Sequence, residues 1–414
     1  MEIYDFRARS FKWRLYGGHN SIEKYLLSEI ERNHANNVFI ITSRSISLRT
    51  KLIQRIQETL GEKYAGAYTA IQKDSSYSSV LEATQAARQA NADLLIAIGG
   101  GSVIVAARAV NIFLCEDSNP LQLMTQYPSD KPAYSPRLLK QKLPTINIPT
   151  TPTSAMNRAG TGLKNDELEQ RMEYFDPKTR PIALFFDEEA VLSAPLELLR
   201  STATTTFSGA LASLATTSPN PLVEGDRLQA FSLANQAYSK IADGHEGSTV
   251  RYDLCTAAFL SNRAADDGPP SGQYGPRDPS AENINPFIGN YSISTVLHLF
   301  PGVGQGEATS VLTATVARKD ANKSSQGSEK IARLLGVWED GMTYQNATLK
   351  CADAIESLYI KAGMPTRIRD LPNIQHKDFQ QIAQQTLHNF NYNRGTRSNA
   401  EQLHNSLELL NLAW

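Results

Sequence analysis

The stretch "IAIGGGSVIVAARAV", from Ile96 to Val110, decides which fold the rest of the chain must build. Its start is typical of a buried strand, its glycines of a tight turn, and its end of an apolar helix. Gly99, Gly100 and Gly101 allow the backbone to approach a ligand with no Cβ in the way. Ser102 stands at a possible N-cap, so free N–H groups and the helix dipole would face an anion. The stretch therefore predicts a phosphate-binding turn.

The glycine spacing fits neither GxGxxG nor a Walker loop, so a tight turn without a ligand is the alternative. Around this turn, strand-like and helix-like segments alternate. The expected strands cover residues 13–18, 37–42, 65–71, 93–101, 145–151 and 181–186. The expected helices cover residues 21–33, 48–61, 78–92 and 102–114. This alternation predicts a mainly parallel sheet wrapped by helices, with an insertion or long loop over residues 116–143.

After Asp187 the pattern changes to apolar residues at helical spacing, interrupted by a stretch rich in Pro and Gly over residues 266–286. The sequence therefore predicts an α/β, Rossmann-like dinucleotide-binding domain over residues 1–187. An all-α domain is expected over residues 188–414, with the active cleft between the two.

Composition narrows the class of protein. The 41 Lys and Arg nearly cancel the 42 Asp and Glu, so nothing indicates a nucleic-acid partner. No apolar run reaches the roughly 18 residues that cross a bilayer, and the N-terminal residues lack the apolar core of a signal peptide. The 3 cysteines are isolated, which is typical of a reduced protein inside the cell. We therefore expect a cytoplasmic protein without a membrane partner.

The order of "AIGGGS", then "INIPTT", then a helical half resembles the iron-containing alcohol dehydrogenase superfamily and its dehydroquinate synthase-like architecture. Within it, "DPKTRPIALFFDEEAVLSAPLELLRSTATTTFSGALASLA" and "HLFPGVGQGEATSVL" are most similar to the maleylacetate reductase group. The resemblance covers most of the chain, roughly residues 8–320. It implies an NAD(P)-linked oxidoreductase with a small-molecule substrate, and a homodimer.

The resemblance implies that the glycine turn with Ser102 binds the cofactor pyrophosphate. Thr150 and Thr151 match threonines that contact the cofactor, and Arg171 matches a lysine near the nicotinamide ribose. At the end of the second strand, where many members have an Asp, this chain has Arg44. A carboxylate there would repel a 2′-phosphate, whereas an arginine would pair with it. NADP is therefore favoured over NAD, with a solvated surface Arg44 as the alternative.

The chain departs from the family pattern near the nicotinamide end. The usual small, glycine-containing continuation is replaced by bulkier residues, of which Pro152, Met156 and Asn157 are expected to crowd that end. The family lysine that follows GGGS is Arg108, and the acidic or small position before it is Val105.

The iron-dependent members supply an Asp and a His four residues apart on one helix, followed by two more histidines. The matching positions here are Gly209 and Ser213 on the helix, then a position near Ser294, and Gln305. Glycine, serine and glutamine are poor ligands for iron, and the 7 histidines show no other cluster with ligand spacing. We therefore expect no metal. His298 matches the family's non-ligand histidine close to the substrate.

Three functions remain open. In a metal-free NAD(P)H-linked reductase of an enone or keto group, His298 would protonate the developing oxyanion while Gln305 and Ser213 orient it. In a repurposed cyclase, isomerase or dehydratase, His298 and Glu307 would provide acid–base catalysis. A ligand-binding pseudoenzyme is the third possibility. In each case the alternative for these polar residues is a structural role, as a hydrogen-bonded helix histidine or as polar residues that stabilise helices.

Overall fold

The computed structural model describes two compact units, one formed by Ser10–Pro195 and one that contains Leu196–Trp414. The described residues are 13–128, 133–168, 171–216, 218, 220–267, 285–288, 291–388 and 399–414. The first unit is α/β and the second is helical, which confirms the fold class predicted from the sequence.

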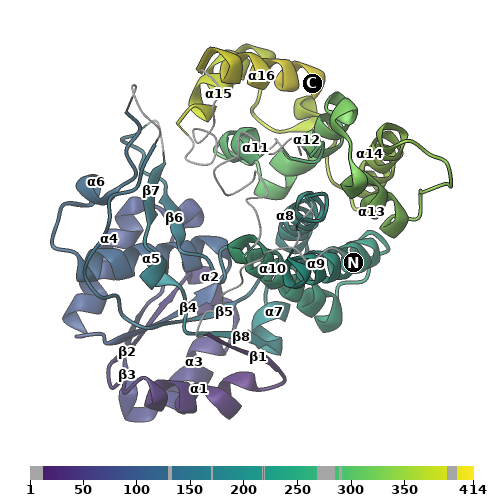
Figure 1. Cartoon of the computed structure of the whole chain (residues 1–414). Coiled ribbons are helices and arrows are strands. Elements are labelled where there is room, and N and C mark those ends of the chain that lie inside the picture. Colours follow the sequence, from purple (N-terminus) through teal and green to yellow (C-terminus); the bar gives the residue numbers. More distant parts are fainter. Residues whose placement is uncertain are drawn as a thin grey trace. The chain divides into compact units, whose positions relative to one another are not determined.

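A six-stranded parallel sheet forms the centre of the α/β unit (Figure 1). Its spatial order is β1 (Arg14–Gly18), β8 (Ala183–Asp187), β5 (Thr145–Pro149), β4 (Leu94–Gly99), β2 (Val38–Thr42) and β3 (Tyr64–Tyr68). The four inner strands are buried along their whole length. Strands of a parallel sheet that is covered on both faces carry near-continuous apolar runs, as β2, β4 and β8 do, whereas β5 also buries the polar residues Thr145 and Asn147.

Helices cover both faces of this sheet (Figure 1). The apolar residues of α1 (Ser21–Arg32) and α3 (Leu52–Leu60) share one core with the strands. On the other face, α4 (Tyr77–Gln89) packs against α5 (Gly101–Cys115), and α5 contacts β4 and β5. Since ligands of such sheets bind outside the carboxyl ends of the strands, a ligand is expected at the loops that follow β4 and β5.

Three features of this unit differ from the sequence prediction. The segment expected as one helix over residues 48–61 is α2 (Arg44–Arg49) followed by α3, because Thr50 between them is extended. An antiparallel hairpin of β6 (Gly160–Leu163) and β7 (Met172–Phe175) was not predicted.

The third difference concerns the expected loop over residues 116–143. It contains α6 (Pro120–Leu123), and its Thr125 N–H donates to the Glu173 carbonyl on β7 at 2.7 Å. Gln126 also pairs with Tyr134 within it. The insertion is therefore built onto the hairpin.

The second unit is helical throughout its described residues. Its helices are α8 (Leu196–Leu214), α9 (Pro221–Ala242), α10 (Ser248–Asp267), α11 (Tyr291–Leu297), α12 (Gln305–Lys319), α13 (Gln326–Leu334), α14 (Tyr344–Lys361), α15 (Phe379–Thr386) and α16 (Asn399–Leu412). One apolar core joins α8, α9, α10, α13 and α14, and another joins α11, α15 and α16. Helix α12 contributes residues to both cores.

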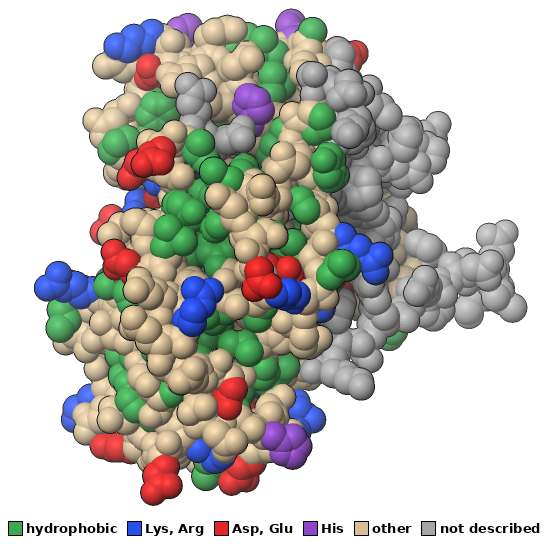
Figure 2. Space-filling model, turned by 90° about the vertical axis from the view of Figure 1, so that its left-hand side faces the viewer, with side chains coloured by type: hydrophobic (Ala, Val, Ile, Leu, Met, Phe, Trp, Pro, Cys, Tyr) green, Lys and Arg blue, Asp and Glu red, His purple; other side chains and the backbone are tan. Residues whose placement is uncertain are grey.

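The described helices contain no candidate membrane span, and the face drawn in Figure 2 shows no block of one charge. Among the described helices, none is both long and apolar enough to cross a bilayer. On the face drawn in Figure 2, basic and acidic side chains are interspersed rather than gathered by sign.

Candidate functional site

The glycine turn joins a strand to a helix as predicted. Strand β4 ends at Gly99 and α5 begins at Gly101, with Gly100 as the N-cap. The prediction that Ser102 caps the helix is therefore wrong, since it lies inside the first turn. Gly99 has a positive φ of 157°, and a Cβ there would lie 2.7 Å from a methyl carbon of Val103. Only glycine fits this turn without displacing that side chain.

The loop after β5 lies against the bare backbone of the turn. A Cβ on Gly100 would stand 3.2 Å from Thr151 Oγ1, and one on Gly101 would stand 3.0 Å from Thr153 Oγ1. The Thr151 hydroxyl is buried and has no hydrogen-bond partner among the residues that the structure describes. The first N–H groups of a helix also lack intrahelical acceptors. A buried polar group without a partner is costly, so these donors suit a ligand that accepts hydrogen bonds, such as a phosphate.

Ser102 has a different role from the one its position suggested. Its Oγ accepts a hydrogen bond from the Asp74 N–H at 3.1 Å, and its carbonyl accepts one from Ser75 Oγ at 2.7 Å. Asp74 and Ser75 both have left-handed backbone, with φ of 59° and 55°. Consecutive non-glycine residues in that region store strain, which often marks functional sites. Sequence reasoning missed this loop because no glycine signals it.

The two predicted cofactor arginines belong to segments other than the glycine turn. Arg44 is the exposed first residue of α2, and it makes no hydrogen bond or ion pair with the described residues. Arg171 donates to the Gly162 carbonyl at 2.8 Å, and its buried Nε has no hydrogen-bond partner in the described part of the chain. A Cβ on Gly162 would lie 3.4 Å from that Nε, so the guanidinium rests against a bare backbone.

The residues expected to crowd the nicotinamide end are buried in the α/β unit. Met156 is fully buried, Asn157 is 3% exposed, and Pro152 is buried too. Thr150 is also buried, and its N–H donates to the Gly99 carbonyl at 3.1 Å.

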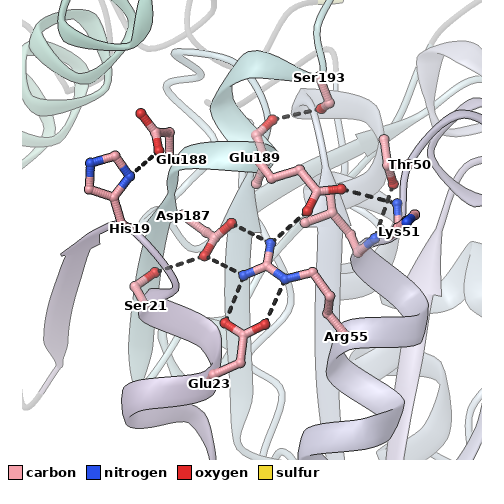
Figure 3. Close-up of polar contacts among 12 residues, drawn as sticks. His19, Ser21, Glu23, Thr50, Lys51, Arg55, Asp187, Glu188, Glu189 and Ser193 are labelled. Carbon is pink, nitrogen blue, oxygen red and sulfur yellow. Dashed lines mark hydrogen bonds and ion pairs between the residues drawn. The ribbon is translucent and has the colours of Figure 1, made fainter.

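A second polar group at the carboxyl edge of the sheet centres on Arg55 (Figure 3). Its guanidinium bonds Glu23, the buried Asp187 and Glu189 at 2.6–3.1 Å. The hydrogen bonds from Arg55 lower the pKa of Glu23. Ser21 donates to Asp187 at 3.3 Å. The central guanidinium is thus saturated by carboxylates, so this group stabilises α1, α3 and β8 against one another.

In the helical unit, the predicted catalytic residues lie on or beside three helices. Ser213 is a buried residue of α8, Gln305 begins α12, and His298 directly follows α11. Both α8 and α11 pack against α12. His298 is half-buried, with Nδ1 3.0 Å from the Val303 carbonyl oxygen. The side chains of Ser213 and Gln305 make no hydrogen bonds with the described residues.

Glu307 is engaged inside the helical unit. Its Oε2 accepts a hydrogen bond from Ser201 Oγ on α8 at 2.7 Å, and that Oγ accepts one from the Gly306 N–H at 3.0 Å. A Cβ on Gly306 would stand 2.1 Å from the Ser201 carbonyl oxygen, so α8 and α12 touch through their backbones here. The carboxylate therefore links the first turn of α12 to α8.

Comparisons with known proteins assign the family. The family profile described as "Iron-containing alcohol dehydrogenase" matches residues 14–188. The profile "Fe-containing alcohol dehydrogenase family, C-terminal" matches residues 290–408. The chain belongs to the iron-containing alcohol dehydrogenase family.

Relatives and solved structures agree with this assignment. A lactaldehyde reductase of Escherichia coli (strain K12) is 22% identical over 398 residues, 94% of this chain and 95% of the relative. The alcohol dehydrogenase from Oenococcus oeni has a TM-score of 0.80 at 17% identity, covering 100% of both chains. A sulfoacetaldehyde reductase from Bifidobacterium kashiwanohense, solved in complex with NAD⁺, has a TM-score of 0.73 at 18% identity, covering 99% of both chains. Maleylacetate reductases occur among both the relatives and the structures.

The helical unit lacks, at its predicted ligand positions, the carboxylate and imidazole side chains that bind iron in the iron-dependent members of the family. The sequence predicts that Gly209, Ser213, Gln305 and a position near Ser294 stand where the iron ligands of the family would be. A glycine has no side chain to donate, and neutral hydroxyl and amide oxygens bind iron far more weakly than imidazole or carboxylate. Among the described residues, no three His, Cys, Asp or Glu gather closely enough to hold a metal. The side chains at these predicted positions are therefore poor donors for iron.

Proposed function

We propose that this chain is a metal-independent, NAD(P)H-linked oxidoreductase that reduces an enone or keto group of a small metabolite. The observation that carries the proposal is the glycine turn faced by Thr151, whose buried hydroxyl lacks a partner. Such a set of unpaired donors at a helix N-terminus is what a pyrophosphate requires. The family assignment and the homologue solved with NAD⁺ support a nicotinamide cofactor.

When bound, the reduced nicotinamide would supply a hydride, which is the chemistry that the protein itself lacks. The residues of this chain then need to bind, orient and protonate. The N–H groups of Gly101 and Ser102 would hold phosphate oxygens, Thr150 and Thr151 would contact the cofactor, and Arg171 would bind toward its nicotinamide ribose.

His298 delivers the proton in this proposal. Imidazole changes charge near neutral pH, so it can hold a proton and release it to a developing oxyanion. The bond between Nδ1 and the Val303 carbonyl fixes the ring, with Nδ1 as the donor. Nε2 is then the ring atom that exchanges a proton. The amide of Gln305 and the hydroxyl of Ser213 are available to orient the substrate oxygen.

Arg44 gives the proposed preference for NADP. The guanidinium of Arg44, which bonds none of the described side chains, can pair with a 2′-phosphate, and this charge-assisted bond would be stronger than one to a neutral ribose hydroxyl.

Titration of the purified protein with NADPH and with NADH, followed by nucleotide fluorescence, tests the proposal. We expect saturable binding of both nucleotides, tighter for NADPH. Absence of binding would refute the reductase and favour the non-redox enzyme or the pseudoenzyme. The active cleft between the two domains, the homodimer, the cytoplasmic location and the lack of a nucleic-acid partner stay predictions.

A further inference from the structure

The loop of residues 152–160 has almost no regular structure, yet scaffold side chains hold most of its carbonyl groups. Arg108 donates to Ala155 and Gly160, Asn147 to Met156 at 2.8 Å, Arg180 to Asn157 at 3.1 Å, and Thr179 to Ala159 at 3.3 Å. The carbonyl groups of most buried segments accept hydrogen bonds from other backbone groups or from water. Here the donors come from three different parts of the α/β unit, namely α5, β5 and the adjacent residues Thr179 and Arg180, so the loop has one fixed path.

Arg108 is the donor that ties this loop to the glycine turn. It lies on α5, the helix that begins at Gly101, and it is 3% exposed. Its guanidinium reaches the carbonyls of Ala155 and Gly160, which stand at the middle and the end of the loop. The planar guanidinium can serve two acceptors at once. Helix and loop are thus held in one arrangement.

Among the described residues, the guanidinium of Arg108 bonds two backbone carbonyls and no carboxylate. Burial, together with the charges of Arg180 and Arg158, lowers the pKa of Arg108 to about 9. The group stays charged at neutral pH, so its bonds to the carbonyls are charge-assisted and stronger than neutral ones. A buried cation without an acidic partner is costly, and the two carbonyl oxygens compensate part of that cost.

The start of the same loop faces the proposed nucleotide site. A Cβ added to Gly100 would lie 3.2 Å from Thr151 Oγ1, and one added to Gly101 would lie 3.0 Å from Thr153 Oγ1. Both threonine hydroxyls are therefore close to the backbone of the glycine turn. A shift of the loop by an ångström would therefore change the space above the turn.

We infer that Arg108 is a positioning residue for nucleotide binding. By holding the carbonyls of Ala155 and Gly160 to α5, it fixes the loop so that Thr151 faces the glycine turn. The inference rests on the proposed nucleotide site and names a residue outside it that sets its affinity. In enzymes, moving a reacting group by about 1 Å can lower the catalytic rate about 100-fold, and binding groups depend on fixed geometry in the same way. Loss of Arg108 should accordingly weaken NADPH binding about 10- to 100-fold.

The test compares Arg108→Met and Arg108→Lys with the matched control Arg88→Met. Arg88 also donates to a backbone carbonyl, that of Phe113 at 3.0 Å, but at the far end of α5. The measurements are the NADPH dissociation constant from fluorescence, hydrogen–deuterium exchange of residues 152–160, and the melting temperature. A lysine ammonium is a compact point donor, so Arg108→Lys should recover part of the affinity.

We expect faster exchange in the loop and weaker binding for Arg108→Met, intermediate values for Arg108→Lys, and wild-type binding for Arg88→Met. Wild-type exchange and affinity in both Arg108 variants would overturn the inference. Equal weakening in Arg88→Met would also overturn it, because the effect would then be general destabilisation. If the wild-type protein binds no nucleotide, the proposed function fails, and the exchange rates still decide whether Arg108 holds the loop.

Discussion

The first turns of α5 and α12 are both glycine-capped helix N-termini, but their surroundings differ. At α5, the turn faces the partnerless hydroxyl of Thr151. At α12, the chain's own Glu307 carboxylate and the Ser201 hydroxyl occupy the corresponding place. Anions stabilise a helix N-terminus wherever they come from. The comparison shows that α12 is satisfied from within, whereas α5 has donors left for a ligand from outside.

The largest expected effect is at His298, which lies next to the internally satisfied helix. Replacing His298 with Ala should reduce turnover about 10²- to 10⁴-fold, the usual contribution of a general acid or base. Substrate affinity should change far less, because little binding surface is removed. The measurement is steady-state kinetics with NADPH and a panel of small enones and ketones.

His298→Asn is the companion variant, since an amide donates a hydrogen bond but supplies no proton. Near-wild-type turnover in both variants would make His298 a packing residue. The catalytic role of the helical unit would then be wrong.

The next largest effect is expected on nucleotide binding at the N-terminus of α5. Gly100→Val should abolish nucleotide binding and leave the fold intact, because its Cβ would stand 3.2 Å from Thr151 Oγ1, above the turn. The measurement is nucleotide titration together with circular dichroism. An unchanged affinity would show that the turn is only structural, and the difference between the two N-termini would lose its functional meaning.

Arg44→Asp should have a smaller effect, on cofactor choice alone. A hydrogen bond to a charged group contributes about 1.5–3 kcal/mol, so the preference for NADPH should shift toward NADH by about tenfold or more. The ratio of the two dissociation constants measures this shift. If the ratio stays at its wild-type value, Arg44 is a solvated surface residue.

Glu307→Gln tests the α12 side. The neutral amide still bonds Ser201, but it no longer places a negative charge at the positive end of the helix dipole. The free energy of unfolding should therefore fall by about 0.5–1 kcal/mol. Turnover should stay within a few-fold of wild type. Thermal melts and kinetics on the same sample separate the two effects. A loss of turnover comparable to that of His298→Ala would instead support acid–base catalysis by Glu307.

Chelation should have the smallest effect. Because Gly209, Ser213 and Gln305 do not fit an iron site, dialysis against a strong chelator should leave activity unchanged. Elemental analysis should find no stoichiometric iron or zinc. Stoichiometric metal that disappears in Gln305→Ala would contradict this prediction.

The sequence predicts the central strands and most long helices because buried parallel strands and amphipathic helices have clear apolar periods. It fails at the β6–β7 hairpin, whose strands "GTGL" and "MEYF" are too short to show a period. It also fails at Thr50, where the break between α2 and α3 carries no Gly or Pro signal.

For the site, the glycine turn was predictable because glycine itself is the signal. The roles of Ser102 and Arg108 were not. Both depend on bonds between a side chain and distant backbone groups, at Asp74 and at Ala155, and any residue type can supply such a backbone partner. Family resemblance aligned Arg108 with a lysine, but the carbonyls that it holds become visible only in three dimensions.

Helix α12 has one more consequence. Its Ala314 and Ala317 belong to one apolar core of the helical unit, while its Val311 and Val316 belong to the other. Unfolding of either core would remove the α12 residues that pack in the other core. The two cores should therefore melt in a single cooperative transition. Gln305 begins this same helix and His298 contacts the residues just before it, so heat inactivation should coincide with that transition.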